Sequence, residues 1–467
     1  GPSWSPVVGS YLVVKRLHGQ LRFAHLVWER LTRKYGQLLG LRLGKDLVVI
    51  ASGSRLVKHV LTSEVFDARP DGFFFRQRAF GGRYGLAFID GDFFTEQKKF
   101  CMRHLRNLGL GRNFMEQKIA YEVEELVQNF MKNCHNPVRL PGEMIYSVAN
   151  SFWTIVAGER FSPDDDKVVN LFKLLELGFK LQDMSGGVLN QMPFLRHVAP
   201  EWTSYNKHIQ VNTAFVGHFR GLIEEHRRTL TSSETRDLID AYLQEIDSRD
   251  EDSTFSENQL IIVLMDLLMA GTESTTSTIG FGLLYLIHYP DVQRKIQEEI
   301  DAQIGTRPVQ LGDRPRTKYI EAFLMELQRF ANVAPSALAH RAKYSSEVQG
   351  YIIPQGTLVL ANLYSVHMDK DHWKDPEVFR PERFLNDDGK IVQDDWLLPF
   401  GTGKRRCMGE TLARSSMYLF ITTLMSNFTI SPVPGAKLPP LEGCDGAAVS
   451  PRPFECMLTP RHEKSCY

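Results

Sequence analysis

The residue with the most distinctive chemistry in the sequence is Cys407, which lies in a glycine-rich, basic turn near the C-terminus. Three cations precede it directly, Lys404, Arg405 and Arg406, and a helical pattern over 410–428 begins soon after it. Neighbouring cations and the N-terminal end of a helix both favour the thiolate form of a cysteine over the thiol. A deprotonated cysteine in such a turn is typical of an axial ligand of haem iron.

The spacing around this cysteine is Phe-x-x-Gly-x-Arg-x-Cys-x-Gly, from Phe400 to Gly409. Gly403 and Gly409 allow the backbone to turn tightly and to approach a flat partner, and Phe400 could cover one side of the sulfur. An isolated cysteine beside basic residues is usually a buried residue next to a surface loop, but here the whole spacing is met. The motif resembles the haem-binding signature of the cytochrome P-450 family. The sequence resembles arthropod members of that family most.

The resemblance extends over essentially the whole chain and implies a haem-thiolate monooxygenase that binds haem b (iron protoporphyrin IX) with Cys407 as the metal ligand. It implies a mainly α fold with a small β lobe (α+β), in which a long central helix crosses the haem. No linker, repeat or low-complexity run divides the 467 residues. We therefore expect a single catalytic domain over 1–467, although this length exceeds the roughly 250–300 residues of a usual single core.

A long helical pattern over 255–289, ended by Pro290, is too apolar in its first half to lie on a surface. Its middle contains Gly271 and a run of hydroxyl side chains over 272–278. Glycine costs about 1 kcal/mol in a helix interior, and serine or threonine can bond back to the carbonyl one turn earlier and bend the helix. Such an irregularity in a core helix indicates a functional role.

The resemblance assigns this role to proton delivery during the activation of dioxygen. Glu273, Ser274 and Thr275 are the catalytic candidates, an acid and alcohols that would organise water, and Gly271 is expected to pass close to the haem. When this helix is aligned with the family pattern, Ser274 stands at the position that the family usually fills with threonine. The hydroxyl is kept and the methyl group is lost.

Glu326 and Arg329 lie three residues apart on a helical pattern, so they share a face and can pair. The resemblance adds Arg383, within Pro-Glu-Arg-Phe, as the third member of a buried network behind the haem. We expect this network to be structural rather than catalytic.

The resemblance also assigns the haem propionates to Lys98, His340 and Arg405. Phe94 and Lys98 stand where the family has tryptophan and arginine, and lysine offers a point charge in place of a bidentate fork. The expected cofactor-binding residues are Phe400, Arg405, Cys407, Gly409, His340, Lys98 and Gly271. The expected substrate pocket contains Phe80, Phe88, Ala270, Ala334, Ala337, Leu338 and Ala448.

Other segments predict the surroundings of this site. The ranges 38–42 and 46–51 are typical of a hairpin that opens the β lobe. Helices over 167–183 and 202–230, separated by a break at 184–187, resemble the family's mobile lid. The charged stretch 232–257 is expected to be a solvated connector.

Composition excludes several classes. Basic and acidic residues number 55 each, and this zero formal charge argues against a nucleic-acid binder. Six cysteines without a C-x-x-C pair indicate neither a zinc site nor a disulfide scaffold, and we expect reduced thiols. The longest apolar run, 260–270, is shorter than the ~20 residues that span a bilayer.

The opening residues 1–10 resemble the proline-rich hinge that follows the membrane anchor of microsomal relatives. We therefore expect the natural protein to be anchored in the endoplasmic reticulum membrane and to face the cytosol. No Gly-x-Gly-x-x-Gly motif is present, so electrons are expected from NADPH-cytochrome P-450 reductase, with cytochrome b5 as an additional donor. The expected docking face is cationic and comprises Lys98, Lys99, Arg103, Lys404 and Arg406.

The expected reaction inserts one atom of dioxygen into a small lipophilic molecule, by hydroxylation or epoxidation of a terpenoid, hormone-like or foreign compound. The alternative is N-hydroxylation of an aromatic amino acid to an aldoxime, whose carboxylate would require Arg76, Arg78 or Arg83. A thiolate-haem isomerase or dehydratase usually dispenses with an acid-alcohol pair. A non-enzymatic haem sensor would not need the irregular central helix.

Overall fold

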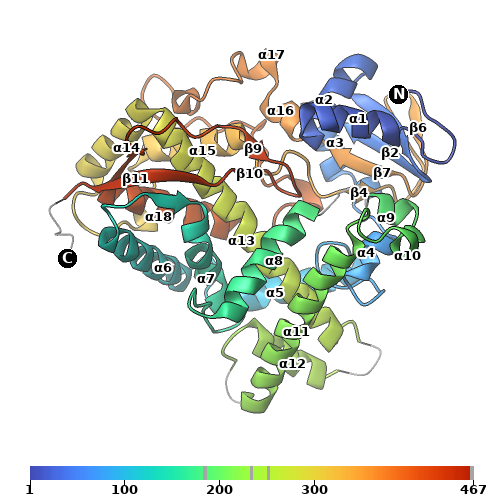
Figure 1. Ribbon diagram of the computed structural model, residues 1–467, viewed down its shortest axis with the longest axis horizontal. Coiled ribbons are helices and arrows are strands. Elements are labelled where there is room, and N and C mark those ends of the chain that lie inside the picture. The colour runs from blue at the N-terminus through green and yellow to red at the C-terminus, as the bar shows by residue number, and fades with distance from the viewer. Residues whose placement is uncertain (182–186, 232–234, 250–252, 463–467) are drawn as a thin grey trace.

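A single long helix, α13 (Glu257–His288), runs through the middle of the molecule, with other helices on its sides (Figure 1). The computed structural model describes residues 1–181, 187–231, 235–249 and 253–462. By length and composition α13 could cross a membrane, but 72% of its most apolar window is buried inside the protein. It is therefore the core helix that the sequence predicts, and Pro290 opens the next helix, α14 (Pro290–Gln303).

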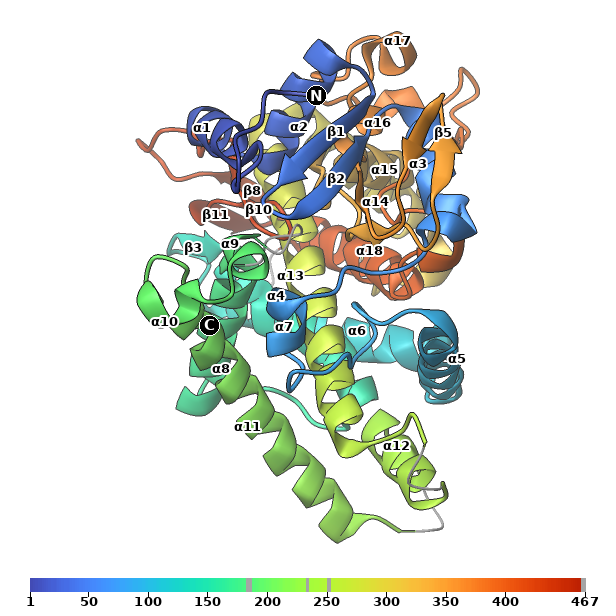
Figure 2. The same ribbon diagram turned by 90° about the vertical axis from the view of Figure 1, so that its right-hand side faces the viewer.

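Figure 2 shows the β-rich lobe on one side of the molecule and the helical body on the other. The N-terminal half contributes helices α1 (Tyr11–Leu21), α2 (Ala24–Tyr35), α3 (Ser54–Thr62), α4 (Phe73–Gln77), α5 (Gly91–Asn107), α6 (Asn113–Lys132), α7 (Ile145–Val156), α8 (Asp166–Leu181), α9 (Gly187–Gln191), α10 (Leu195–Val198) and α11 (Tyr205–Thr229). The C-terminal half adds α12 (Leu238–Asp247), α15 (Lys318–Ala331), α16 (Tyr364–His367), α17 (Lys370–Trp373) and α18 (Glu410–Asn427).

The small β lobe is built on a four-stranded sheet in the order β1 (Leu38–Leu43), β2 (Asp46–Ala51), β7 (Leu358–Ala361) and β4 (His340–Arg341). The predicted hairpin is confirmed, because β1 and β2 pair in antiparallel register with Leu43 opposite Asp46. The smaller sheets contain β3 (Val138–Leu140), β11 (Phe454–Pro460) and β8 (Phe428–Pro432), then β5 (Ser346–Val348) with β6 (Tyr351–Ile353), and β9 (Gly443–Cys444) with β10 (Ser450–Pro451). The predicted fold class, mainly α with a small β lobe, is confirmed.

The expectation of a solvated connector over 232–257 is wrong for its centre. The ten-residue helix α12 lies there, and Leu238, Ile239 and Leu243 are fully buried. The Tyr242 hydroxyl donates to Gln97 Oε1 at 2.6 Å and ties α12 to α5. The charged residues that suggested a connector flank an amphipathic helix whose apolar face packs on the core. Residues 232–234 and 250–252 lie outside the described residues.

Two further expectations concern the lid and the cysteines. Helices α8 and α11 are present, but 182–186, which contain most of the predicted break, lie outside the described residues. Cys101, Cys407, Cys444 and Cys456 are free thiols.

Candidate active site

The Cys407 loop is a tight turn that leads into α18. The Cys407 amide donates to the Phe400 carbonyl at 3.0 Å and closes the loop. Gly403 has a φ of 73°, and a Cβ there would lie 2.1 Å from the Leu61 carbonyl oxygen, so only glycine fits against α3. The loop is thereby held on the β lobe, with the cysteine side chain accessible.

The cations of this loop make their direct contacts with carboxylates and carbonyls, so only part of the electrostatic argument from the sequence holds: burial raises the pKa of the Cys407 thiol and outweighs the lowering by the charge of Arg406. Arg406 forms a two-point ion pair with Glu410 at 2.6 and 2.8 Å, and Lys404 lies 3.2 Å from an Asp67 carboxylate oxygen. Although Cys407 is accessible from one side, protein surrounds the sulfur, and burial raises the pKa of the thiol. Backbone N–H groups of Gly409 and Glu410 oppose this rise. A directly bound metal cation is what would convert the sulfur to thiolate.

Arg405 turns away from Cys407 and lies in a cationic cluster between the loop and the β lobe. Its guanidinium donates to the carbonyls of Asp67 and Ile89 at 2.8 and 2.9 Å and lies 3.6 Å above the Phe94 ring. Its Nη1 is buried without a hydrogen-bond partner in the described part of the chain. The Lys98 ammonium donates to the Lys404 carbonyl at 2.9 Å, and burial, followed by Arg405, lowers the pKa of Lys98.

Arg69 belongs to the same cluster and was not among the predicted site residues. It is 5% exposed, and its Nη1 donates to the carbonyls of Leu338 and Ala339 at 2.7 and 2.9 Å. Burial, followed by the charge of Arg405, lowers its pKa to about 9. Its only sequence signal is a place in a loop rich in arginine and aromatic residues, which does not distinguish it from Arg76 or Arg78.

The centre of α13 has the predicted irregularity. The Ser274 hydroxyl donates to the Ala270 carbonyl at 2.7 Å, and the Thr278 hydroxyl donates to the Ser274 carbonyl at 2.8 Å. Ala270 is exposed although most of its neighbours in α13 are buried. Thr275 is 7% exposed, so it faces the core, whereas Ser274 lies on the same face as Ala270.

Gly271 has a packing reason of its own. A Cβ at this position would lie 3.0 Å from the Phe152 ring of α7. The missing side chain therefore lets α13 and α7 approach closely. The contact of Gly271 with the haem stays a prediction, and because glycine has no side chain it would involve backbone atoms only.

Glu273 lies on the side of α13 that faces α8. Burial, reinforced by the charge of Glu176, raises its pKa to about 7, and Lys180 opposes this rise. Lys180 and Glu176 form an exposed ion pair at 2.5 Å. Glu273 can therefore exchange a proton near neutral pH, next to two polar side chains that reach solvent.

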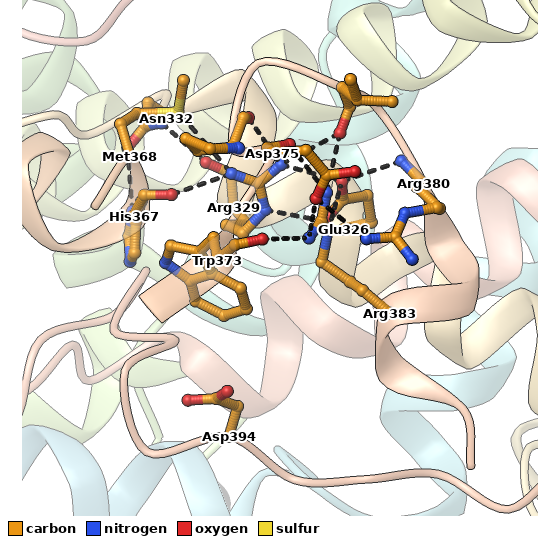
Figure 3. A network of polar contacts seen from close by, with 12 residues as sticks. Glu326, Arg329, Asn332, His367, Met368, Trp373, Asp375, Arg380, Arg383 and Asp394 are labelled. Carbon is orange, nitrogen blue, oxygen red and sulfur yellow. Dashed lines mark hydrogen bonds and ion pairs between the residues drawn. The ribbon is translucent and has the colours of Figure 1, made fainter. Parts of the chain in front are cut away.

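Glu326, Arg329 and Arg383 form the buried network that Figure 3 shows. Arg329 binds both carboxylate oxygens of Glu326 at 2.8 Å, and Arg383 Nε lies 3.0 Å from Glu326 Oε1. Arg329 also donates to the carbonyls of His367 and Pro376 at 2.8 and 3.0 Å. Glu326 and Arg329 are completely buried, so each charge depends on the others.

A cavity lies between α4, α8, α11 and α13. It is lined by Phe74, Phe75, Gln77, Arg78, Phe88, Gly178, His208, Val211, Asn212, Met265 and Met269. Of the predicted pocket residues, Phe88 lines it. Phe80 does not, because it is 40% exposed and lies beneath the Arg220 guanidinium.

Four other predicted pocket residues come from two loops, one between α15 and β4 and one between β9 and β10. The Val449 amide donates to the Val333 carbonyl at 2.8 Å, so the segments that contain Ala448 and Ala334 lie next to each other. Ala334 is exposed. Ala337 and Leu338 lie half-buried beside the buried His340. None of these residues lines the cavity described above.

Comparison with known proteins agrees with this geometry. Residues 1–458 match the family model for cytochrome P-450. The chain belongs to the cytochrome P-450 family. Farnesoate epoxidase of Bombyx mori is 40% identical over 463 residues, which cover 99% of this chain and 93% of the relative. Probable cytochrome P-450 305a1 of Drosophila melanogaster is 38% identical over 473 residues, 99% of this chain and 94% of the relative. Cytochrome P-450 2D6 of Homo sapiens is 34% identical over 472 residues, 99% of this chain and 93% of the relative.

Haem b, which the family binds through a cysteine thiolate, fits the residues of this P-450. Arg69 is buried and Arg405 is half-buried, and each has a buried nitrogen, Nε or Nη1, without a described partner. The charges of Asp67 and Asp90 act on both arginines, but Asp67 also pairs with Lys343 and Lys404, so cations outnumber carboxylates here. The two carboxylates of haem b would offset this excess of positive charge, while Cys407 would supply the iron ligand.

His340 lies in this region but contributes no charge by itself. It is 1% exposed, its Nδ1 lies 2.6 Å from the Phe66 carbonyl, and burial lowers its pKa to about 3. A neutral ring that donates from Nδ1 to this carbonyl has only an acceptor at Nε2. To bind a propionate through Nε2, His340 would have to take up a proton, and the negative charge of the propionate would stabilise the resulting imidazolium.

The raised pKa of Glu273 predicts a pH-dependent contribution to stability. The folded protein keeps a proton on Glu273 up to about pH 7, whereas the ordinary value is 4.5. The contribution is complete below the ordinary value and is lost as the pH rises through the folded value. Between acid and neutral pH, we expect the free energy of unfolding of the wild type to fall by at most about 3 kcal/mol relative to that of Glu273→Gln. Thermal unfolding of the haem-loaded protein measures this, with exposed Glu143→Gln as a control that follows the wild type. Parallel pH profiles for the wild type and Glu273→Gln would contradict the assignment.

Removal of Glu326 should prevent haem loading. Glu326→Ala leaves Arg329 buried without its carboxylate, at a cost of about 3–5 kcal/mol. We expect a low ratio of Soret to protein absorbance. Glu382→Ala is the control, because Glu382 lies one residue from Arg383 but forms a half-exposed ion pair with Lys295. Full haem content in Glu326→Ala would show that the network is dispensable.

Proposed function

We propose that this P-450 is a microsomal monooxygenase that epoxidises or hydroxylates a neutral lipophilic terpenoid or a similar hormone-like or foreign compound. In this proposal Cys407 holds the haem iron within one catalytic domain. Glu273 and Ser274 deliver protons, and Thr275 supports the helix from the core side. The similarity to a farnesoate epoxidase supports a terpenoid substrate and an epoxidation. Farnesoate is itself a carboxylate, so the neutral character of the substrate proposed here rests on the cavity of this chain and not on that relative.

The main support for a neutral substrate is that three arginines near the cavity are each paired with an aspartate. Arg76 binds Asp71 at 2.6 and 2.7 Å, and Arg83 binds Asp90 at 2.8 and 3.1 Å. Arg78, which lines the cavity, pairs with the buried carboxylate of Asp266. A substrate carboxylate would have to displace an acidic side chain to reach any of them.

The pairing of Arg78 is well supported by its surroundings. The other Asp266 oxygen accepts from the amides of Leu86 and Ala87 at 2.6 and 2.9 Å. Asp266 is therefore held in place by three donors, the Arg78 side chain and the amides of Leu86 and Ala87, and does not swing away from Arg78 at low cost. These contacts weigh against the alternative, N-hydroxylation of an aromatic amino acid, which needs a free pocket cation.

The remaining lining favours apolar ligands with a small polar end. Phenylalanine and methionine side chains form most of the cavity wall, which is typical of sites for lipophilic molecules. His208 is neutral at physiological pH because burial lowers its pKa. Gln77, His208 and Asn212 offer uncharged hydrogen-bonding groups for an ester, ketone or hydroxyl group.

The proposed partners are NADPH-cytochrome P-450 reductase, with cytochrome b5 as an additional donor, and the endoplasmic reticulum membrane. Phe194, Val198 and Trp202 are 60%, 75% and 59% exposed. The Lys15 ammonium of α1 lies 5.3 Å from the Trp202 ring, so this apolar patch adjoins the N-terminal segment. Such a patch is suited to contact with the membrane surface.

The reductase would dock on the opposite, cationic face near α5. Lys99, Arg103, Lys404 and Arg406 are exposed there, while Lys98 is half-buried and donates to a backbone carbonyl. Lys99→Glu should lower reductase-supported turnover several-fold because it introduces repulsion toward an acidic partner. Turnover supported by hydrogen peroxide should not change. Lys173→Glu, an exposed change on α8, is the control, and equal losses in both variants would argue against this docking face.

The substrate proposal is tested with a terpenoid methyl ester and its free acid in spectral titrations of the ferric protein. We expect the ester to bind at least ~10-fold more tightly in the wild type, since each step of ~1.4 kcal/mol changes affinity tenfold. Asp266→Asn releases the charge of Arg78 and should improve binding of the acid. Asp71→Asn releases the more exposed Arg76, which does not line the cavity, and should leave both affinities unchanged. Equal or tighter binding of the acid by the wild type would overturn the neutral substrate.

A further inference from the structure

A second cavity opens to the surface between the N-terminal half of α8 and the C-terminal half of α11. Its lining includes Glu159, Lys167, Gly217, His218, Gly221 and Glu225. None of these residues lines the cavity beside α13. We call this cavity the α8–α11 groove.

The groove exists because one face of α11 lacks side chains. Gly217 and Gly221 lie four residues apart on that face, and a Cβ built on either would meet nothing within 4 Å. Each glycine costs helix stability of about 1 kcal/mol relative to alanine. No close approach of another element explains them, so the space itself is the feature that they provide.

Two carboxylates, Glu159 and Glu225, face this space. Burial on its protein side, followed by the charge of Glu225, raises the pKa of Glu159, although the side chain is accessible from the groove. Lys167 lines the groove but has no carboxylate oxygen of either glutamate within 4 Å. The lining therefore has a net negative charge that no described cation neutralises by direct contact.

Buried polar atoms next to the groove also lack partners. The Trp153 indole is completely buried, and its N–H has no hydrogen bond that meets ordinary geometry, but it is close enough to Glu159 to lower the pKa of that carboxyl. His218 is kept neutral by burial, and its Nε2 has no partner in the described part of the chain. A ligand that holds Glu159 in a fixed position would allow its carboxylate to accept a hydrogen bond from the Trp153 N–H.

Glu159 and Glu225 belong to no group of three close metal-ligating side chains in the described part of the chain. The one such group consists of His226, Asp237 and Asp240, whose ligand atoms lie within 4.8 Å of one another. In that group His226 Nε2 pairs with Asp237 at 2.9 Å and Arg236 pairs with Asp240 at 2.6 Å, so it is an internal ion-pair cluster. The two carboxylates of the groove are therefore better suited to a cation that brings several N–H donors than to a bare ion that needs further ligands.

We propose that the α8–α11 groove binds a small guanidinium compound, which bridges Glu159 and Glu225 over the floor formed by Gly217 and Gly221. A guanidinium is planar and donates several N–H groups in fixed directions, so it can pair with two carboxylates at once. Its flat face fits a floor without side chains. Glu159 lies in the connection between α7 and α8, so the bound ligand ties that connection to α11 outside the haem pocket.

The test is calorimetric titration of methylguanidinium chloride into the haem-loaded protein, with sodium chloride at equal ionic strength as the blank. We expect saturable binding with one site per chain and no change in the Soret band, since the groove is separate from the haem. Glu225→Gln and Gly221→Leu should each weaken binding at least ~10-fold, or about 1.4 kcal/mol. Glu224→Gln removes the same charge from the same turn of α11 without lining the groove, and it should bind as the wild type does.

Absence of saturable binding by the wild type would overturn the proposal. Equal weakening by Glu224→Gln and Glu225→Gln would also overturn it, because the effect would then be general charge attraction. Unchanged binding by Gly221→Leu would show that the ligand lies elsewhere. None of these results depends on turnover, so they are independent of the proposed monooxygenase reaction.

Discussion

Two arginine side chains, Arg69 and Arg405, lie between the β lobe and the cysteine loop, and their environment constrains the rest of the structure. Arg69 is buried and Arg405 is half-buried, and each has a buried nitrogen without a described partner. Burial lowers the pKa of both groups, while the charges of Asp67 and Asp90 oppose this lowering. Asp67 also pairs with Lys343 and Lys404, so cations outnumber carboxylates in this cluster. The carboxylates of haem b would offset that excess of positive charge.

The electrostatics of the cysteine follow from the same constraint. Basic residues around Cys407 suggest a stabilised thiolate when the sequence is read alone. In the structure Lys404, Arg405 and Arg406 contact Asp67, backbone carbonyls and Glu410 instead. Their charges hold the loop against its neighbours, and the sulfur is left to the iron and to backbone N–H groups.

The lid helices α8 and α11 connect two different environments. At one end they border an apolar cavity whose arginine is neutralised by Asp266, which suits an uncharged substrate. At the other end they border the α8–α11 groove, where two carboxylates lack a cation. The same pair of helices thus separates a site without net charge from a site with negative charge. Their mutual position affects both.

The family, the cofactor, the central helix, the β1–β2 hairpin and the Glu326–Arg329 pair were all accessible from the sequence, because each depends on residues that are close together in the chain. Periodicity over 255–289 predicts a core helix, and a spacing of three predicts a shared helix face. The tertiary structure alone decided that Arg69 belongs to the cationic cluster, that Thr275 faces the core, that Phe80 lies at the surface and that α12 is buried. It also decided the partners of Arg78 and Arg405, because those partners come from segments far away in the sequence. A local pattern determines which side chains share a face, but only the packed chain determines which distant group lies opposite that face.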